Sequence, residues 1–310
     1  MPPKIVYLTV SAKRAILAAL TGFNTIFYGI ETRLMYKKPL EISCYVAGAG
    51  AFGVFFRWLQ DQLAFDENGL NEKSFFNFLV PALVIAAMLL FRHFVNAMKQ
   101  RRLAPPEDFC HALYNPGKLF TILRWTASVV MIAGAVLLMM SSEADLHADL
   151  MRVLCLLAAL SGLAFPLVLG QANYDSFGNQ PLVRIGTMLP VVMYAFWLVL
   201  SYLQNQLNSV PWSFAVEMFT LICAMLGFFR AAGFAFFSVD GYKALFWTMM
   251  GSAACIMSLA DERYMGMQLM LLASAGMLLL YVWILVRNLE RQQNKADGPE
   301  ANEGGFEKVN

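Results

Sequence analysis

The chain has 310 residues, of which 59% are hydrophobic and 14% charged, and its formal net charge is +2. This composition is too apolar for an ordinary soluble domain. The apolar runs are continuous rather than alternating, which excludes a transmembrane β-barrel and favours membrane-spanning helices. We therefore expect the lipid bilayer, and no nucleic acid, to surround most of the chain.

The first 39 residues form a basic segment that allows two interpretations. Residues 15–30 are apolar, but the run is short for a span and basic residues flank both of its ends. Polar side chains recur along it at helical spacing, which is typical of an amphipathic helix lying on the cytoplasmic membrane surface. We favour that interfacial helix. The alternative is a tilted ninth span whose polar stripe faces the bundle.

Eight later runs are long and apolar enough to cross a membrane, which takes roughly 20 residues each. The predicted spans are 40–60, 74–98, 119–140, 149–169, 182–203, 212–230, 243–260 and 265–287. They leave no room for a soluble domain. The prediction is an all-α, polytopic integral membrane bundle of eight transmembrane helices, followed by a disordered cytoplasmic tail at 288–310.

Basic residues are distributed unevenly between the two sides of this predicted bundle. All but four of the 23 Lys and Arg residues fall on one side, and the exceptions are Arg57, Lys73, Arg152 and Arg263. Since cytoplasmic connections carry the excess of Lys and Arg, we expect both termini in the cytoplasm and the bundle in a bacterial-type plasma membrane. The arginines at cytoplasmic span ends are typical of contact with anionic lipid.

A glycine motif in the first span resembles a nucleotide-binding fingerprint. The segment Gly48-Ala-Gly50-Ala-Phe-Gly53 fits G-x-G-x-x-G letter for letter. That fingerprint requires a strand before it and free backbone N–H groups, whereas a membrane helix has already bonded its amides. We interpret it as a smooth helix face, on which Ala47, Gly50 and Ala51 let a neighbouring helix approach closely.

Three prolines, Pro81, Pro166 and Pro190, lie inside the second, fourth and fifth predicted spans. Each should remove a helical hydrogen bond and bend its helix. Pro166 and Pro190 flank loop 170–180, the stretch between spans that is richest in uncharged polar residues, so this pair is a candidate kink or gate. A packing feature beside a solvated turn is the simpler explanation.

Glu217 is the acidic residue set deepest in a predicted span, and it is therefore the first candidate for a functional site. Its helix carries a stripe of polar and small side chains that includes Thr220, and the seventh span carries a matching stripe that includes Thr248. These stripes should face other helices. Arg57 and Arg152 are predicted at a similar depth, so we expect Glu217 to pair with one of them. Such a pair could fix helix register, or the carboxylate could line a cavity that binds a cation, a proton or an amine.

No catalytic motif, haem-type histidine pair or metal-ligand spacing occurs, so we expect no cofactor and no metal, and we lean against an enzyme. Two function classes remain. The first is a transporter or permease-like protein for a small solute, ion or lipid. The second is a membrane scaffold or sensor that docks partners on its basic cytoplasmic face. The first is favoured only by how common transport is among proteins with eight spans.

Overall fold

The computed structural model describes residues 39–63, 78–141, 148–171, 181–205, 211–236, 240–261 and 263–291. Several sequence predictions lie outside these residues: the interfacial helix or ninth span at 15–30, most of the polar loop at 170–180, and the tail beyond residue 291. The described part is sufficient to define the bundle and both of its ends.

Within the described ranges, eight long apolar helices make up the bundle, which confirms the all-α prediction. They are α2 (Pro39–Leu63), α4 (Leu79–Gln100), α6 (Lys118–Ser141), α7 (Ala148–Gln171), α8 (Pro181–Asn205), α9 (Pro211–Ala232), α10 (Gly241–Met257) and α11 (Met265–Arg287). Short 3-10 turns follow two of them, η2 (Gly233–Phe236) and η3 (Ser258–Ala260). Each helix is long enough to cross a membrane, so the chain is a multi-pass membrane protein.

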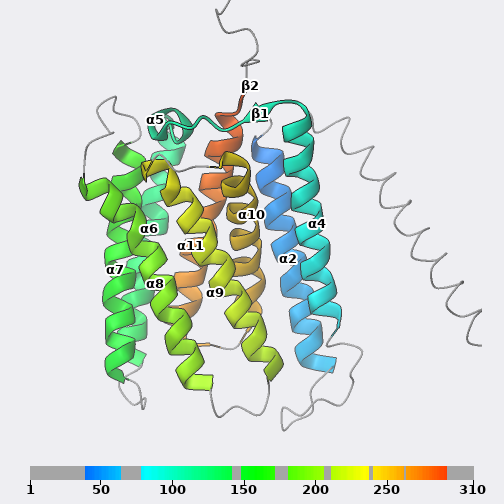
Figure 1. Ribbon diagram of the computed structural model, residues 1–310. Coiled ribbons are helices and arrows are strands. Elements are labelled where there is room, and N and C mark those ends of the chain that lie inside the picture. Colours follow the sequence, from blue (N-terminus) through cyan, green and yellow to red (C-terminus); the bar gives the residue numbers. More distant parts are fainter. Residues whose placement is uncertain are drawn as a thin grey trace, which may run out of the picture.

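Helices α10 and α11 lie at the centre of the bundle (Figure 1). Helices α6, α7, α8 and α9 follow one another in chain order around one side, each packed on the next, and α2 and α4 pack on the other side of α10. Helix α11 contacts α6, α10 and α2. The two central helices are apolar on nearly every face because neighbouring helices surround them.

The small-residue stripes predicted on the sixth and seventh spans face each other. A Cβ on Gly251 of α10 would lie 2.8 Å from the Cys223 carbonyl oxygen of α9, and one on Gly227 would lie 3.0 Å from the Trp247 carbonyl oxygen. A Cβ at either position would collide with the opposite carbonyl oxygen, so only glycine lets the two backbones pack this closely. The prediction that these stripes meet other helices is confirmed.

The glycine motif of α2 also packs against α10. A Cβ on Gly50 would lie 2.7 Å from Ile256, and one on Gly53 would lie 2.8 Å from Met257. The motif is therefore a helix-packing face, as predicted, but its members differ from the expected set. Ala51 is exposed and Gly48 faces open space, while Gly53 makes the second close contact.

The prolines differ in where they fall within their helices. Pro166 and Pro190 lie inside α7 and α8, as predicted, and both helices continue past them. Pro81 does not interrupt a helix, because α4 begins at Leu79 rather than at residue 74. It lies in the first turn, where the backbone nitrogen has no helical acceptor to lose. The predicted bend at Pro81 is wrong for that reason.

One end of the bundle carries a short backbone strap, and we call it the strand end. Strand β1 (Leu103–Ala104) follows α4 and pairs antiparallel with β2 (Glu290–Arg291), which follows α11. A one-turn helix, α5 (Phe109–Ala112), lies between β1 and α6. The Asn288 side chain donates hydrogen bonds to the carbonyl oxygens of Ala112 (2.9 Å) and Tyr114 (3.0 Å). This strap holds the end of α11 to the segment that joins α4 to α6.

Candidate functional site

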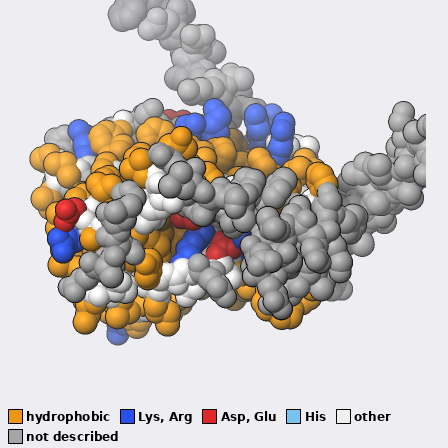
Figure 2. Space-filling model, turned by 90° about the horizontal axis from the view of Figure 1, so that it is seen from below, with side chains coloured by type: hydrophobic (Ala, Val, Ile, Leu, Met, Phe, Trp, Pro, Cys, Tyr) orange, Lys and Arg blue, Asp and Glu red, His pale blue; other side chains and the backbone are white. Residues whose placement is uncertain are grey.

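The opposite end of the bundle contains a cluster of charged side chains, and we call it the network end. Acidic and basic side chains lie together in a hollow near the middle of this face (Figure 2). Arg57 projects from α2, and its Nε lies 2.6 Å from Oδ1 of Asp261, just after η3. Arg57 also donates from Nη1 to Oε1 of Gln60 at 2.6 Å. The Arg57 and Asp261 side chains are only 3% and 9% exposed, so this is a buried ion pair.

Asp261 is the centre of the cluster. Its second oxygen, Oδ2, accepts hydrogen bonds from Oγ of Ser258 (3.0 Å) and from Nη2 of Arg263 (2.8 Å). Its backbone carbonyl accepts a further bond from the Gln268 side chain at 3.2 Å. Three donor groups thus satisfy the carboxylate of Asp261, as a buried carboxylate requires, and a fourth satisfies its backbone carbonyl.

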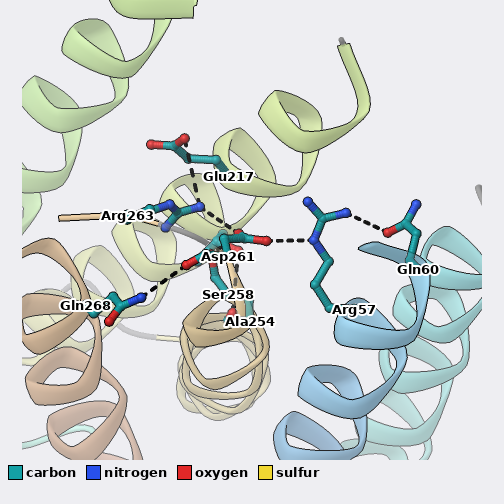
Figure 3. A network of polar contacts seen from close by, with 9 residues as sticks. Arg57, Gln60, Glu217, Ala254, Ser258, Asp261, Arg263 and Gln268 are labelled. Carbon is teal, nitrogen blue, oxygen red and sulfur yellow. Dashed lines mark hydrogen bonds and ion pairs between the residues drawn. The ribbon is translucent and has the colours of Figure 1, made fainter. Parts of the chain in front are cut away.

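Glu217 joins this cluster through Arg263 and not through a direct contact with Asp261 or Arg57 (Figure 3). Glu217 lies in the second turn of α9, and its Oε2 is 3.8 Å from Nη2 of Arg263. That separation permits an ion pair but is too long for a hydrogen bond. The cluster therefore runs from α2 through the α10–α11 turn to α9.

The pairing predicted for Glu217 needs correction. Its partner is Arg263, while Arg57 pairs with Asp261. Arg152 lies at the start of α7, where it pairs with Asp149 of the same helix, and the two side chains are 55% and 94% exposed. The sequence placed Arg152 at the correct end of the bundle, but the order of the helices puts it on the solvated edge of that end.

The two threonines lie deeper than the charged cluster. Both are fully buried. Thr220 Oγ1 donates to the Ala254 carbonyl oxygen of α10 at 3.4 Å, and Thr248 Oγ1 donates to the Ala244 and Leu245 carbonyl oxygens of its own helix. Their hydroxyl groups are satisfied by backbone, and neither residue lines the pocket beside Glu217.

An open pocket of about 500 Å³ lies at the edge of the cluster. Its lining residues are Gln204, Glu217, Arg263, Tyr264 and Met267. They come from α8, α9, the connection before α11, and α11 itself. Nη1 of Arg263 is buried and has no hydrogen-bond partner among the residues that the structure describes. One wall of the pocket therefore carries a loosely paired carboxylate and an incompletely bonded guanidinium.

The sequence singled out Glu217 and Arg57 but missed Asp261 and Arg263 as their partners. A signal was present: Arg263 is one of the four basic residues on the predicted outer side, and it falls in the short connection between the last two spans. A connection that short must stay close to the helix ends. The matching stripes on the sixth and seventh spans would then have placed it near Glu217.

Comparisons with protein-family models, with curated proteins and with solved structures gave no match for this chain. Among the described residues, no group of three or more His, Cys, Asp or Glu side chains lies close enough to hold a metal ion. What the site can do must therefore be argued from its own charges and its pocket.

Proposed function

We propose that the protein is a permease-like transporter, and that the pocket beside Glu217 and Arg263 is where a small polar solute first binds. One observation carries the proposal. A carboxylate and a guanidinium that are both largely buried, with side chains 16% and 8% exposed, line a common pocket, and neither is fully satisfied by the described protein groups.

The energetic cost of a buried charge distinguishes this pocket from an ion pair that only fixes helix register. Placing a charged side chain in a membrane helix costs roughly 2.5–3.5 kcal/mol unless partners or water compensate it. Asp261, which is buried in the turn after η3, is compensated by hydrogen bonds from Ser258 and Arg263 and by its short contact with Arg57. Glu217 has only the 3.8 Å contact with Arg263 among the described residues. A ligand that donates to Glu217 would supply the missing hydrogen bonds.

The position of the pocket is the second supporting feature. The pocket is open at the network end, which the charge asymmetry predicts to be the outer face. One turn deeper, Thr220 is fully buried against α10, and the close crossing of α9 and α10 follows. A solute could therefore move inward between α9 and α10 only after these two helices separate. One-sided access to a site between helices is what alternating access requires of each of its end states.

The test combines binding with flux. Purified full-length protein is screened by thermal shift against a library of small polar solutes and lipids, and the hits are then assayed for uptake into proteoliposomes. We expect at least one solute to raise the melting temperature and to accumulate in the vesicles. The conservative variant Glu217→Gln should abolish both effects, whereas Arg152→Gln, which changes an exposed ion pair at the same end, should preserve both.

Two outcomes would contradict the proposal. If no solute stabilises the wild-type protein, the pocket is not a binding site, and the scaffold or sensor alternative becomes the better account of the bundle. If a solute stabilises the protein but the stabilisation survives Glu217→Gln unchanged, the solute binds elsewhere.

A further inference from the structure

The charges around the pocket balance one another. Among the described residues of the cluster, Arg57 and Arg263 are matched by Asp261 and Glu217, so these four side chains together are electrically neutral when all are ionised. A simple cation entering the pocket would leave one buried positive charge without compensation, and a simple anion would leave one negative charge. Such a charge is strongly unfavourable in a medium of low dielectric constant. A ligand of zero net charge avoids this penalty.

The two incompletely satisfied groups differ in what they need. Glu217 is an acceptor with no hydrogen bond among the described residues, and Nη1 of Arg263 is a donor with no partner there. A ligand ammonium would donate to the first, and a ligand carboxylate would accept from the second. Hydrogen bonds between ionised groups are the strong ones in proteins. A neutral alcohol or amide could make the same contacts only in their weaker uncharged form.

The spacing of the pair limits the size of such a ligand. Oε2 of Glu217 lies 3.8 Å from Nη2 of Arg263, and the unbonded Nη1 belongs to the same guanidinium, so ligand groups that pair with Glu217 and Nη1 must also be close to each other. From this geometry we infer that the pocket, if it binds a solute as proposed above, selects a short zwitterion in which one or two carbon atoms separate an ammonium from a carboxylate. Gln204 and Tyr264 add polar groups to the wall, and Met267 adds an apolar surface.

A length and charge series tests the inference on the full-length protein. The zwitterions are glycine, β-alanine and 6-aminohexanoate, and the singly charged probes are propylamine and propionate. Binding is measured by calorimetry in detergent or nanodiscs. We expect glycine or β-alanine to bind about tenfold more tightly than the other probes, because each of those lacks one charge-assisted bond or holds its charges too far apart.

A charge-changing variant supplies an independent test. Glu217→Gln removes the partner of the ammonium and leaves the buried cluster with a net positive charge. Propionate should therefore bind this variant more tightly than β-alanine, which reverses the order found in the wild type. Arg152→Gln should keep the wild-type order. Because the test compares two ligands on one folded protein, a general loss of stability would not imitate the reversal.

The outcomes separate this inference from the proposed function. If propylamine binds as tightly as β-alanine, if 6-aminohexanoate binds as tightly as glycine, or if Glu217→Gln weakens every probe equally, the zwitterion inference is wrong. The same is true if the solute library yields a ligand but none of the zwitterions binds, and in all these cases the pocket remains a solute site. If neither the series nor the library binds, the proposed function itself fails.

Discussion

The two ends of the bundle both carry an aspartate paired with a basic residue, but they use it differently. At the network end, Asp261 is 9% exposed and contacts Arg57, Arg263 and Ser258, which come from two different parts of the chain. At the strand end, Asp240 is 40% exposed, and its ion pair is with Lys243, three residues further on, whose side chain and backbone amide both contact it. The residue type is the same, so burial and the origin of the partners must determine how much each aspartate contributes to the stability of the protein.

The electrostatic consequence is clearest at the exposed site. Burial by itself would raise the pKa of Asp240, but hydrogen bonds from the side chain and backbone amide of Lys243 outweigh it and lower the pKa below its usual value. Its stabilising effect is therefore present near neutral pH and is lost as the pH falls through that lowered pKa. Because both partners are well exposed, solvent screening keeps the effect small.

The largest expected effect comes from replacing the buried aspartate. Asp261→Asn would leave Arg57 without its buried anionic partner, and breaking a buried pair in this way costs about 3–5 kcal/mol. The matched variant Asp240→Asn keeps a helix-capping side chain and should cost less than about 1 kcal/mol. Unfolding titrations in mixed micelles measure both free energies. Equal losses would show that burial does not distinguish the two ends.

A close approach of two backbones provides the next test. A Cβ on Gly266, at the start of α11, would lie 2.5 Å from the Gly134 carbonyl oxygen of α6. Gly266→Ala should therefore destabilise the network end by about 1–3 kcal/mol through overpacking. On the same helix, a Cβ on Gly276 meets nothing within 4 Å. Gly276→Ala should be neutral or slightly stabilising, and a comparable loss in both variants would contradict the packing argument.

A smaller effect is expected from the strap at the strand end. Asn288→Ala removes the two hydrogen bonds to the carbonyl oxygens of Ala112 and Tyr114. We expect a loss of about 1 kcal/mol in unfolding free energy, since each such bond has a modest net value. Hydrogen exchange should accelerate locally in residues 109–115, while the helices at the network end stay protected. Uniform acceleration throughout the bundle would show that the strap is not a local device.

The smallest effect should come from the exposed pair at the network end. Arg152→Gln breaks the contact with Asp149, whose side chain is 94% exposed. Surface pairs of this kind often contribute nothing measurable. The melting temperature should therefore match that of the wild type, and a drop as large as that of Asp261→Asn would place Arg152 in the buried cluster after all.

Predictions of the spans, which depend on local sequence, were confirmed, whereas the predicted partners of Glu217, which depend on contacts between distant residues, were not. The helices were predictable because each depends on its own run of apolar residues, and the last span, 265–287, coincides with α11 from Met265 to Arg287. That the stripes of small residues on α9 and α10 face other helices was also predicted, since both helices carry them at helical spacing. The pairing of Glu217 was not foreseen, because the similar predicted depth of Arg57 and Arg152 favoured them, whereas Arg263 could be placed near Glu217 only by combining the short last connection with the packing of α9 on α10.

The sequence by itself determined that the eight described apolar runs form helices long enough to span a membrane, since a continuous run of about 20 apolar residues has few other stable states. It also identified Glu217 as a costly charge that would need compensation. Only the tertiary structure decided which groups compensate it. Arg57 and Asp261 are 204 residues apart in the chain, and they meet because α2 packs against α10. That packing depends on the shapes of whole helix faces, so the partners of the charged residues at the network end are a property of the assembled bundle.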